Sequence, residues 1–169
     1  MVHSIELLFD DATEATIRRI WDDLATADIP SRAPAGRPHV TLAVADRIAE
    51  DVDALLRPLT ERLPLDCSVG ASLLLGRTHA ILARLIVPTA CILAFQADVH
   101  RVCGERLQPE AAPNSLPGHW TPHVTLARSV GAPALGPALR IAGRPPLIEG
   151  TFSALRRWNG DTKAEYRIA

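Results

Sequence analysis

The chain has 169 residues, of which 47% are hydrophobic, and its formal net charge is −1. This length allows one domain with a sizeable core and excludes two ordinary domains. The near-neutral charge excludes a broadly basic surface that would hold duplex nucleic acid without sequence preference. Arginine supplies nearly all of the positive charge, since Lys163 is the only lysine, and arginine forks suit phosphate groups.

Several features of the sequence bear on where the protein resides. The three cysteines form no close pair, which argues against a disulfide framework and fits a reducing compartment. The N-terminus lacks the basic and apolar regions of a signal peptide. The longest apolar stretch, residues 80–95, is interrupted by Arg84 and Pro88. We therefore expect a cytoplasmic protein with no membrane-spanning segment.

The first half of the chain has alternating strand and helix signals. Residues 11–27 place apolar side chains on one face at helical spacing, with Thr13 as the expected N-cap. In chain order we expect a strand at 4–10, a helix at 11–27, a Pro/Gly-bearing loop at 28–38, the hexapeptide PHVTLA at 38–43, a helix at 50–63 and a strand at 65–76.

The second half repeats this order and the same hexapeptide. We expect a strand at 79–88, a helix at 89–107, a loop at 108–122, PHVTLA at 122–127, a helix at 132–143 and strands at 147–160 and 164–169. Short matches can arise by chance in a chain rich in alanine, leucine and proline. An identical hexamer within the same order of elements instead indicates an internal duplication, approximately 1–76 and 77–169. We predict a single bilobal domain over 1–169, with two lobes about a pseudo-twofold axis.

Each hexapeptide carries a His-x-Thr motif on an expected strand. Side chains alternate between the faces of a strand, so His39 shares a face with Thr41, and His123 with Thr125. Two lobes related by a twofold axis would bring these pairs together in one cleft. A neutral imidazole can accept a proton while an imidazolium donates one, and hydroxyl groups can stabilise charge on phosphate oxygens. This set suits phosphodiester chemistry without a metal.

The segments PHVTLAVAD and PHVTLARSV resemble the 2H phosphoesterase superfamily, and within it the 2′-5′ RNA ligase-like proteins, also described as RNA 2′,3′-cyclic phosphodiesterases. The resemblance implies a bilobal α+β fold in which antiparallel sheets line a central cleft and helices lie outside. It implies action on 2′,3′-cyclic phosphate at RNA ends or on nucleotides, without metal or cofactor. Attack by a 5′-hydroxyl on the same cyclic phosphate would give 2′-5′ RNA ligase activity. We expect a monomer.

By motif position, the resemblance makes His39 and His123 the acid/base pair and Thr41 and Thr125 the donors to phosphate oxygens. It further implies His123 as the base toward water and His39 as the acid toward the leaving ribose oxygen. Arg128 matches a substrate-binding arginine, because RNA-processing members often extend the second motif to His-x-Thr-x-x-Arg.

Two departures affect this match. Strict alternation would turn Arg128 away from the face of His123 and Thr125, so its role requires the strand to end or bulge before it. The first motif has Val44 where an arginine would correspond.

Two residues outside the motifs are candidates for substrate contact. Trp120 lies in the loop three residues before His123 and is the best candidate for stacking a base. Arg37, in the basic loop just before His39, is a candidate for contact with an RNA phosphate.

Other interpretations are open for these residues. The cleft could bind a nucleotide or RNA end without turnover, the two histidines could be strand residues satisfied by the backbone, or they could be metal ligands, although no pattern such as HExxH accompanies them. For the remaining candidates we expect ordinary roles: His3 and His79 at the surface or in the core, His100 exposed, His119 in a solvated loop, and solvated guanidinium groups at Arg77, Arg84, Arg156 and Arg157.

Overall fold

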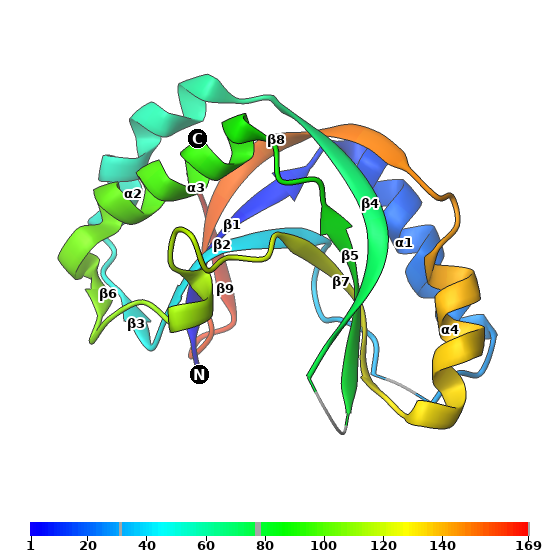
Figure 1. The fold of residues 1–169 in the computed structure, drawn as a ribbon. Helices are drawn as coiled ribbons and strands as arrows, with labels where there is room; N and C mark the ends of the chain where they lie inside the picture. Colours follow the sequence, from blue (N-terminus) through cyan, green and yellow to red (C-terminus); the bar gives the residue numbers. More distant parts are fainter. Residues whose placement is uncertain (31, 77–78, 169) are drawn as a thin grey trace.

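In the computed structural model, which describes residues 1–30, 32–76 and 79–168, strands and helices follow the predicted order (Figure 1). The strands are β1 (His3–Phe9), β2 (His39–Ala45), β3 (Arg47–Ile48), β4 (Leu65–Leu75), β5 (Ala80–Ile86), β6 (Leu107–Gln108), β7 (His123–Val130), β8 (Ile148–Asn159) and β9 (Ala164–Ile168). The α-helices are α1 (Asp11–Thr26), α2 (Val52–Leu56), α3 (Ala90–Cys103) and α4 (Leu135–Ala142). The 3₁₀ helices are η1 (Arg57–Arg62), η2 (Gly104–Arg106), η3 (Pro113–Ser115) and η4 (Ala132–Ala134). The short strands β3 and β6 are present in the structure but are not predicted from the sequence.

The larger strands form one antiparallel sheet in the order β2-β1-β8-β4-β5-β7, with β9 beside β8. The α+β class with antiparallel strands is therefore confirmed. The strands β2, β1 and β8 are continuous with β4, β5 and β7, because β4 pairs with β8 from Leu65↔Phe152 to Val69↔Ile148. This sheet bends into an arch (Figure 1), and its two end strands, β2 and β7, lie in contact on the concave side.

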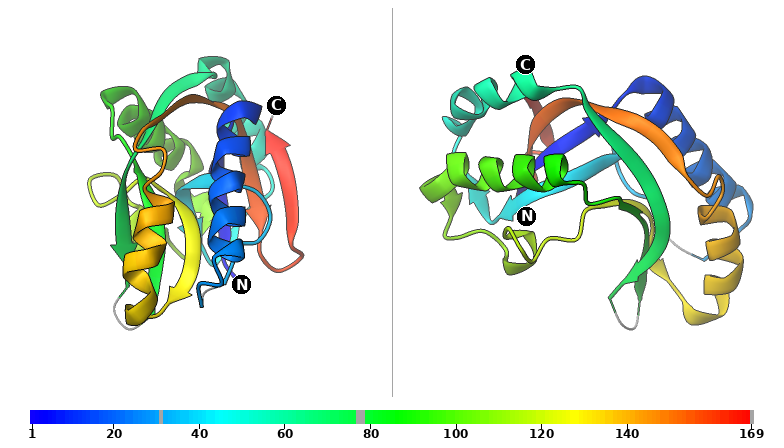
Figure 2. Two further views of the ribbon diagram at one scale, coloured as in Figure 1. Left: turned by 90° about the vertical axis from the view of Figure 1, so that its right-hand side faces the viewer. Right: turned by 45° about the horizontal axis from the view of Figure 1, so that its top comes forward.

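Two pairs of helices cover the outside of the arch (Figures 1 and 2). Helix α1 packs with α4 and contacts β7 and β8, while α3 packs with α2 and contacts β2. Each long helix therefore lies against the hexapeptide strand that comes from the other half of the sequence.

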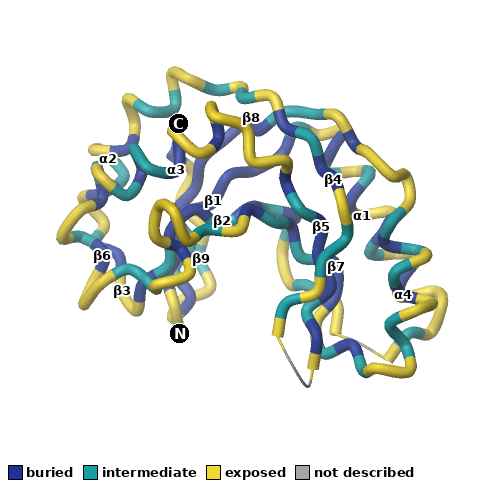
Figure 3. Tube along the Cα trace, in the orientation of Figure 1, coloured by how far each residue is buried: buried dark blue, intermediate teal, exposed yellow. Residues whose placement is uncertain are grey.

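The core lies between the sheet and these helices. Strand β1, in the middle of its lobe, is buried along its whole length, whereas yellow exposed segments mark the outer turns of the helices (Figure 3). Helix α1 turns Ile17, Ile20 and Leu24 into this core, at the spacing that the sequence predicts. Each such fully buried aliphatic side chain contributes roughly 1.5–3 kcal/mol.

The start of α1 differs from the prediction. The N-cap is Asp10, whose Oδ1 accepts from the Thr13 backbone N–H at 2.9 Å, so the prediction of Thr13 as the cap is wrong. Thr13 is instead a buried residue of the first turn, and its hydroxyl donates to Asp10 Oδ2 at 2.7 Å. A Cβ atom at Gly150 would lie 1.9 Å from the Thr13 Oγ1 atom, so glycine permits this close approach of α1 to β8.

The helix expected at 50–63 changes type after Leu56 and continues as η1. Pro58 stands at the start of η1, where its missing backbone N–H breaks the α-helical hydrogen-bond pattern. The helix expected at 132–143 likewise begins as η4 before α4.

The prediction of solvated arginines is wrong for Arg84, Arg156 and Arg157, which are all buried. Burial is tolerated because most of their donors find acceptors, although the buried Nη1 atom of Arg157 has no hydrogen-bond partner among the described residues. Arg84 donates to the carbonyl oxygens of Gly70, Val69, Ala142 and Pro146. Arg157 forms a fork with Asp53 of α2, with both distances 2.8 Å, whereas Arg156 reaches Glu6 of β1. The two neighbours thus point to opposite faces of β8. Arg77 lies outside the described residues.

None of the helices in the described part of the chain is both long and apolar enough to cross a membrane. The cytoplasmic location, the monomeric state and the internal duplication stay predictions.

Candidate active site

The two His-x-Thr motifs begin the end strands β2 and β7. His39 and Thr41 are half-buried on one face of β2, and Val40 and Leu42 are buried on the other. Strand β7 has the same pattern over its first four residues. A cavity of about 310 Å³ between the strands is lined by both motif pairs, His39, Thr41, His123 and Thr125. The structure thus brings all four predicted residues together.

The two imidazoles are held in the same way. His39 Nδ1 lies 2.8 Å from the carbonyl oxygen of Arg37, and His123 Nδ1 lies 2.7 Å from that of Thr121. A carbonyl oxygen only accepts hydrogen bonds, so both Nδ1 atoms carry a proton. Each ring therefore leaves Nε2 as the atom that can take up or release a proton.

Both motif strands contain a β-bulge at the same position. In β2, Thr41 pairs with Glu6 and Ala43 with Ile5, so Leu42 is the extra residue. In β7, Thr125 pairs with Ala83 and Ala127 with Leu82, so Leu126 is the extra residue. Each bulge shifts the alternation by one residue.

The shifted alternation returns Arg128 to the face of His123 and Thr125. Arg128 is exposed and lines the cavity. Val44, at the corresponding position of β2, also lines the cavity. The condition that the sequence sets for Arg128, a bulge before it, is therefore met. The backbone of Arg128 also exchanges hydrogen bonds of 2.7 and 2.8 Å with Arg32 of the loop before β2.

Two tryptophans bind the carbonyl groups of the motif threonines. Trp21 Nε1 of α1 donates to the Thr125 oxygen at 3.2 Å, and Trp120 Nε1 donates to the Thr41 oxygen at 2.8 Å. Trp120 also lines the cavity, and its stacking on a base stays a prediction.

Helix α3 binds the bulge of β2. Its Gln96 donates to the Leu42 carbonyl oxygen at 3.2 Å, and His100 Nε2 lies 3.0 Å from the same atom. The expectation of an exposed His100 is therefore wrong: the ring is partly buried, and burial lowers its pKa, although this hydrogen bond opposes the shift.

Arg37 takes a different position from the one predicted for phosphate contact. Its guanidinium binds Glu14 of α1 at 2.5 and 3.0 Å, and its carbonyl oxygen holds His39. Among the described residues that line the cavities beside His39, Arg37 is absent. Its contact with substrate stays a prediction that requires the pair with Glu14 to open.

A second cavity, of about 240 Å³, adjoins the first and shares His39, Thr125 and Arg128 with it. Its other walls include Arg156 and Trp158 of β8. Neither residue is among the site residues predicted from the sequence, where Arg156 is expected to be solvated. Alternation along β8 places them on one face, but only the pairing of β8 with β1 places that face beside His39.

The two histidines have different electrostatic environments. Burial lowers the pKa of His123, and the nearby charges of His39 and Arg128 lower it further, against the opposing hydrogen bond to Thr121. His39 Nε2 instead lies 3.6 Å from the Oε1 atom of Glu6. In the described part of the chain, no group of three or more His, Cys, Asp or Glu side chains is arranged to hold a metal ion.

Comparisons with known proteins give the family and the fold of this chain. A model of the 2′-5′ RNA ligase superfamily matches residues 9–164. Similar solved structures include E. coli LigT complexed with 3′-AMP, at 13% identity and a TM-score of 0.58, covering 98% of this chain and 91% of that chain. TT0787 of Thermus thermophilus has 14% identity and a TM-score of 0.61, covering 100% and 96%. The MHV ns2 PDE domain has 13% identity and a TM-score of 0.59, covering 99% of both. At these identities the structures show a shared fold, and no curated protein sequence gives a significant match.

Proposed function

The chain belongs to the 2′-5′ RNA ligase superfamily of 2H phosphoesterases, and from this premise we propose that it is a metal-independent phosphodiesterase that opens 2′,3′-cyclic phosphates at RNA ends or on nucleotides. The observation that carries the proposal is the matched pair of imidazoles, each bonded through Nδ1 to the carbonyl two residues earlier, in one cavity. Two such groups can act as acid and base on opposite sides of one phosphorus atom.

The phosphate group would lie where the two cavities meet, beside His39, Thr125 and Arg128. The hydroxyls of Thr41 and Thr125 would donate hydrogen bonds to its non-bridging oxygens, and the Arg128 guanidinium would neutralise their growing negative charge. The 3′-AMP in the E. coli LigT structure supports a ribose phosphate as the ligand.

In the proposed reaction, His123 Nε2 accepts a proton from water as the water oxygen forms a bond to phosphorus. The bond between phosphorus and one ribose oxygen breaks, and His39 Nε2 donates its proton to that oxygen. The product is a 2′- or 3′-phosphate, depending on which ribose oxygen faces His39. If the 5′-hydroxyl of a second RNA replaces water, the same proton transfers join the two strands.

The test is turnover of a panel of 2′,3′-cyclic nucleotides and oligonucleotides with cyclic phosphate ends, with and without EDTA. Replacing either motif histidine by alanine should lower kcat/KM by about 10³-fold, because each variant lacks a proton-transfer group. His79→Ala, which changes an exposed histidine outside both cavities, should retain wild-type kcat/KM.

Wild-type turnover in both His39→Ala and His123→Ala would contradict the proposal. Tight binding of the panel with no product at any pH would favour a binding module, and loss of activity with EDTA would favour metal-assisted hydrolysis. Chromatography of the product isomer identifies the leaving oxygen.

A further inference from the structure

A buried carboxylate lies beside one of the two motif histidines. Glu6 is 3% exposed in the middle of β1, where it pairs with Thr41 of β2 on one side and Arg156 of β8 on the other. Its Oε1 atom accepts a hydrogen bond from Ser4 Oγ at 2.5 Å and lies 3.6 Å from His39 Nε2. The carboxylate therefore faces the proton-exchanging atom of His39.

Arg156 holds this carboxylate in place. Its Nε and Nη2 atoms each lie 2.7 Å from Glu6 Oε2, and its Nη1 atom binds Glu165 of β9. One guanidinium thus binds both carboxylates, and of the two only Glu6 also faces His39. A protonated His39 would place a positive charge beside the Glu6 carboxylate, and opposite charges in a partly buried site favour such a state.

The hydrogen bond of His39 to Arg37 strengthens this preference. Because Nδ1 carries the proton of the neutral ring, the Nε2 lone pair of neutral His39 would face the carboxylate oxygen. In the imidazolium form an N–H group faces the same oxygen. The other charged or titratable groups around His39 are Arg128 and His123 of β7 and His119 of the loop before β7, which share its cavity.

His123 has no corresponding carboxylate. Among the described residues, none of the ion pairs includes His123, and its cavity neighbours Arg128 and His39 disfavour a second positive charge. The two rings therefore have the same hydrogen-bond geometry but opposite electrostatic surroundings.

We propose that Glu6, held by Arg156, is a positioning residue that keeps His39 protonated and so makes it the proton donor, which leaves His123 as the proton acceptor. This inference rests on the proposed function, since it assigns the direction of proton transfer in the same site. Glu6 acts through His39 and does not touch the reacting atoms.

The test compares kcat/KM from pH 5 to pH 9 in wild type and Glu6→Gln, on a 2′,3′-cyclic nucleotide that the wild type hydrolyses. A proton donor loses activity as pH rises, so the alkaline limb reports His39 and the acidic limb reports His123. Glu6→Gln should move the alkaline limb down by about one pH unit, and the acidic limb should stay in place.

Glu165→Gln is the matched control, because it also removes a carboxylate from Arg156 but lies on β9, where no ion pair or hydrogen bond of the described residues joins it to His39. Its pH profile should equal that of the wild type. An alkaline limb that stays in place in Glu6→Gln, or that moves as far in Glu165→Gln, would overturn the inference.

NMR titration of the His39 ring in the free protein gives a readout that needs no turnover, with the signal assigned by its loss in His39→Ala. The His39 midpoint should fall in Glu6→Gln and stay in Glu165→Gln. If the wild type hydrolyses nothing, the proposed function fails while this titration still decides whether Glu6 controls His39.

If circular dichroism shows that Glu6→Gln does not fold, Glu6→Asp replaces it, because the shorter side chain draws the carboxylate back from the ring. The His39 midpoint should then fall, and a midpoint at or above the wild-type value would overturn the inference.

Discussion

At the scale of single residues, the site consists of two identical His-x-Thr motifs in unequal surroundings. The sequence predicts the motifs and the shared face of each His and Thr. It does not predict Glu6 or Trp158 as neighbours of His39, because their proximity depends on pairing between strands that lie far apart in the chain. An acidic residue inside the apolar segment SIELLF is the sign in the sequence that Glu6 is a buried charge.

Thr125 provides a test of the hydroxyl groups. Thr125→Val keeps the β-branched shape of the side chain and the backbone carbonyl that Trp21 binds, but removes the donor to phosphate. We expect kcat to fall about 100-fold with a smaller change in KM, as for loss of one donor that acts mainly in the transition state. Steady-state kinetics on the best cyclic nucleotide measures this effect.

Thr125→Ser is the matched variant for this comparison, because it keeps the hydroxyl and loses only a methyl group. It should retain most of the wild-type kcat. Equal kcat values for Thr125→Val and the wild type would remove the hydroxyl from the mechanism.

At the scale of helices and strands, periodicity predicts the large elements well and their ends less well. The alternating pattern predicts β2 and β7, but the bulges at Leu42 and Leu126 arise from their pairing with β1 and β5. The start of α1 is misplaced because Asp10 and Thr13 are both common N-cap residues. Asp10 also binds Thr151 of β8, a contact between distant parts of the chain that periodicity does not predict.

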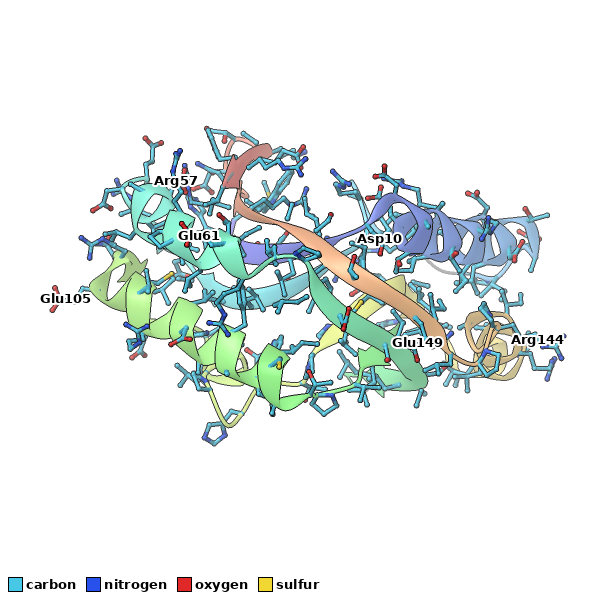
Figure 4. The ribbon with its side chains drawn as sticks, turned by 90° about the horizontal axis from the view of Figure 1, so that it is seen from above. Asp10, Arg57, Glu61, Glu105, Arg144 and Glu149 are labelled. Atoms are coloured by element: carbon cyan, nitrogen blue, oxygen red, sulfur yellow. The ribbon has the colours of Figure 1, made fainter. Side chains whose placement is uncertain are left out.

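Asp10 joins α1 to β8 at the end of β1, as its labelled side chain shows (Figure 4). It accepts hydrogen bonds from Thr13 and from the backbone N–H of Thr151, the latter at 2.7 Å. Burial opposes ionisation, but these hydrogen bonds outweigh it and lower the pKa of Asp10 to about 2. Asp10→Ala should therefore lower the free energy of unfolding by about 1–2 kcal/mol at pH 7, measured by urea denaturation.

The lowered pKa of Asp10 determines how its contribution to stability changes with pH. The folded-state pKa of Asp10 is lower than its unfolded value, so its contribution is complete above about pH 4 and is lost as the pH falls toward 2. The difference between the wild type and Asp10→Ala should shrink over that range. A difference that stays constant from pH 7 to pH 2 would show that the carboxylate charge contributes nothing.

At the scale of the whole molecule, one arched sheet brings its two end strands together. The duplicated order of elements predicts two lobes and a shared cleft, and the resemblance to 2H phosphoesterases predicts the α+β fold. The continuity of the sheet through β4 and β8, and the packing of α1 and α3 on the strands of the opposite halves, could not be predicted, because periodicity identifies elements but not their long-range partners. The cavity depends on this arch, since each motif strand supplies only half of it.

The most direct test is a crystal structure of the protein with a 2′- or 3′-nucleotide bound. We predict one phosphate group in the cavity between β2 and β7, with the Nε2 atoms of His39 and His123 each about 3 Å from a phosphate oxygen. A phosphate bound elsewhere, or one that reaches a single histidine while the other ring lies too far away, would contradict it.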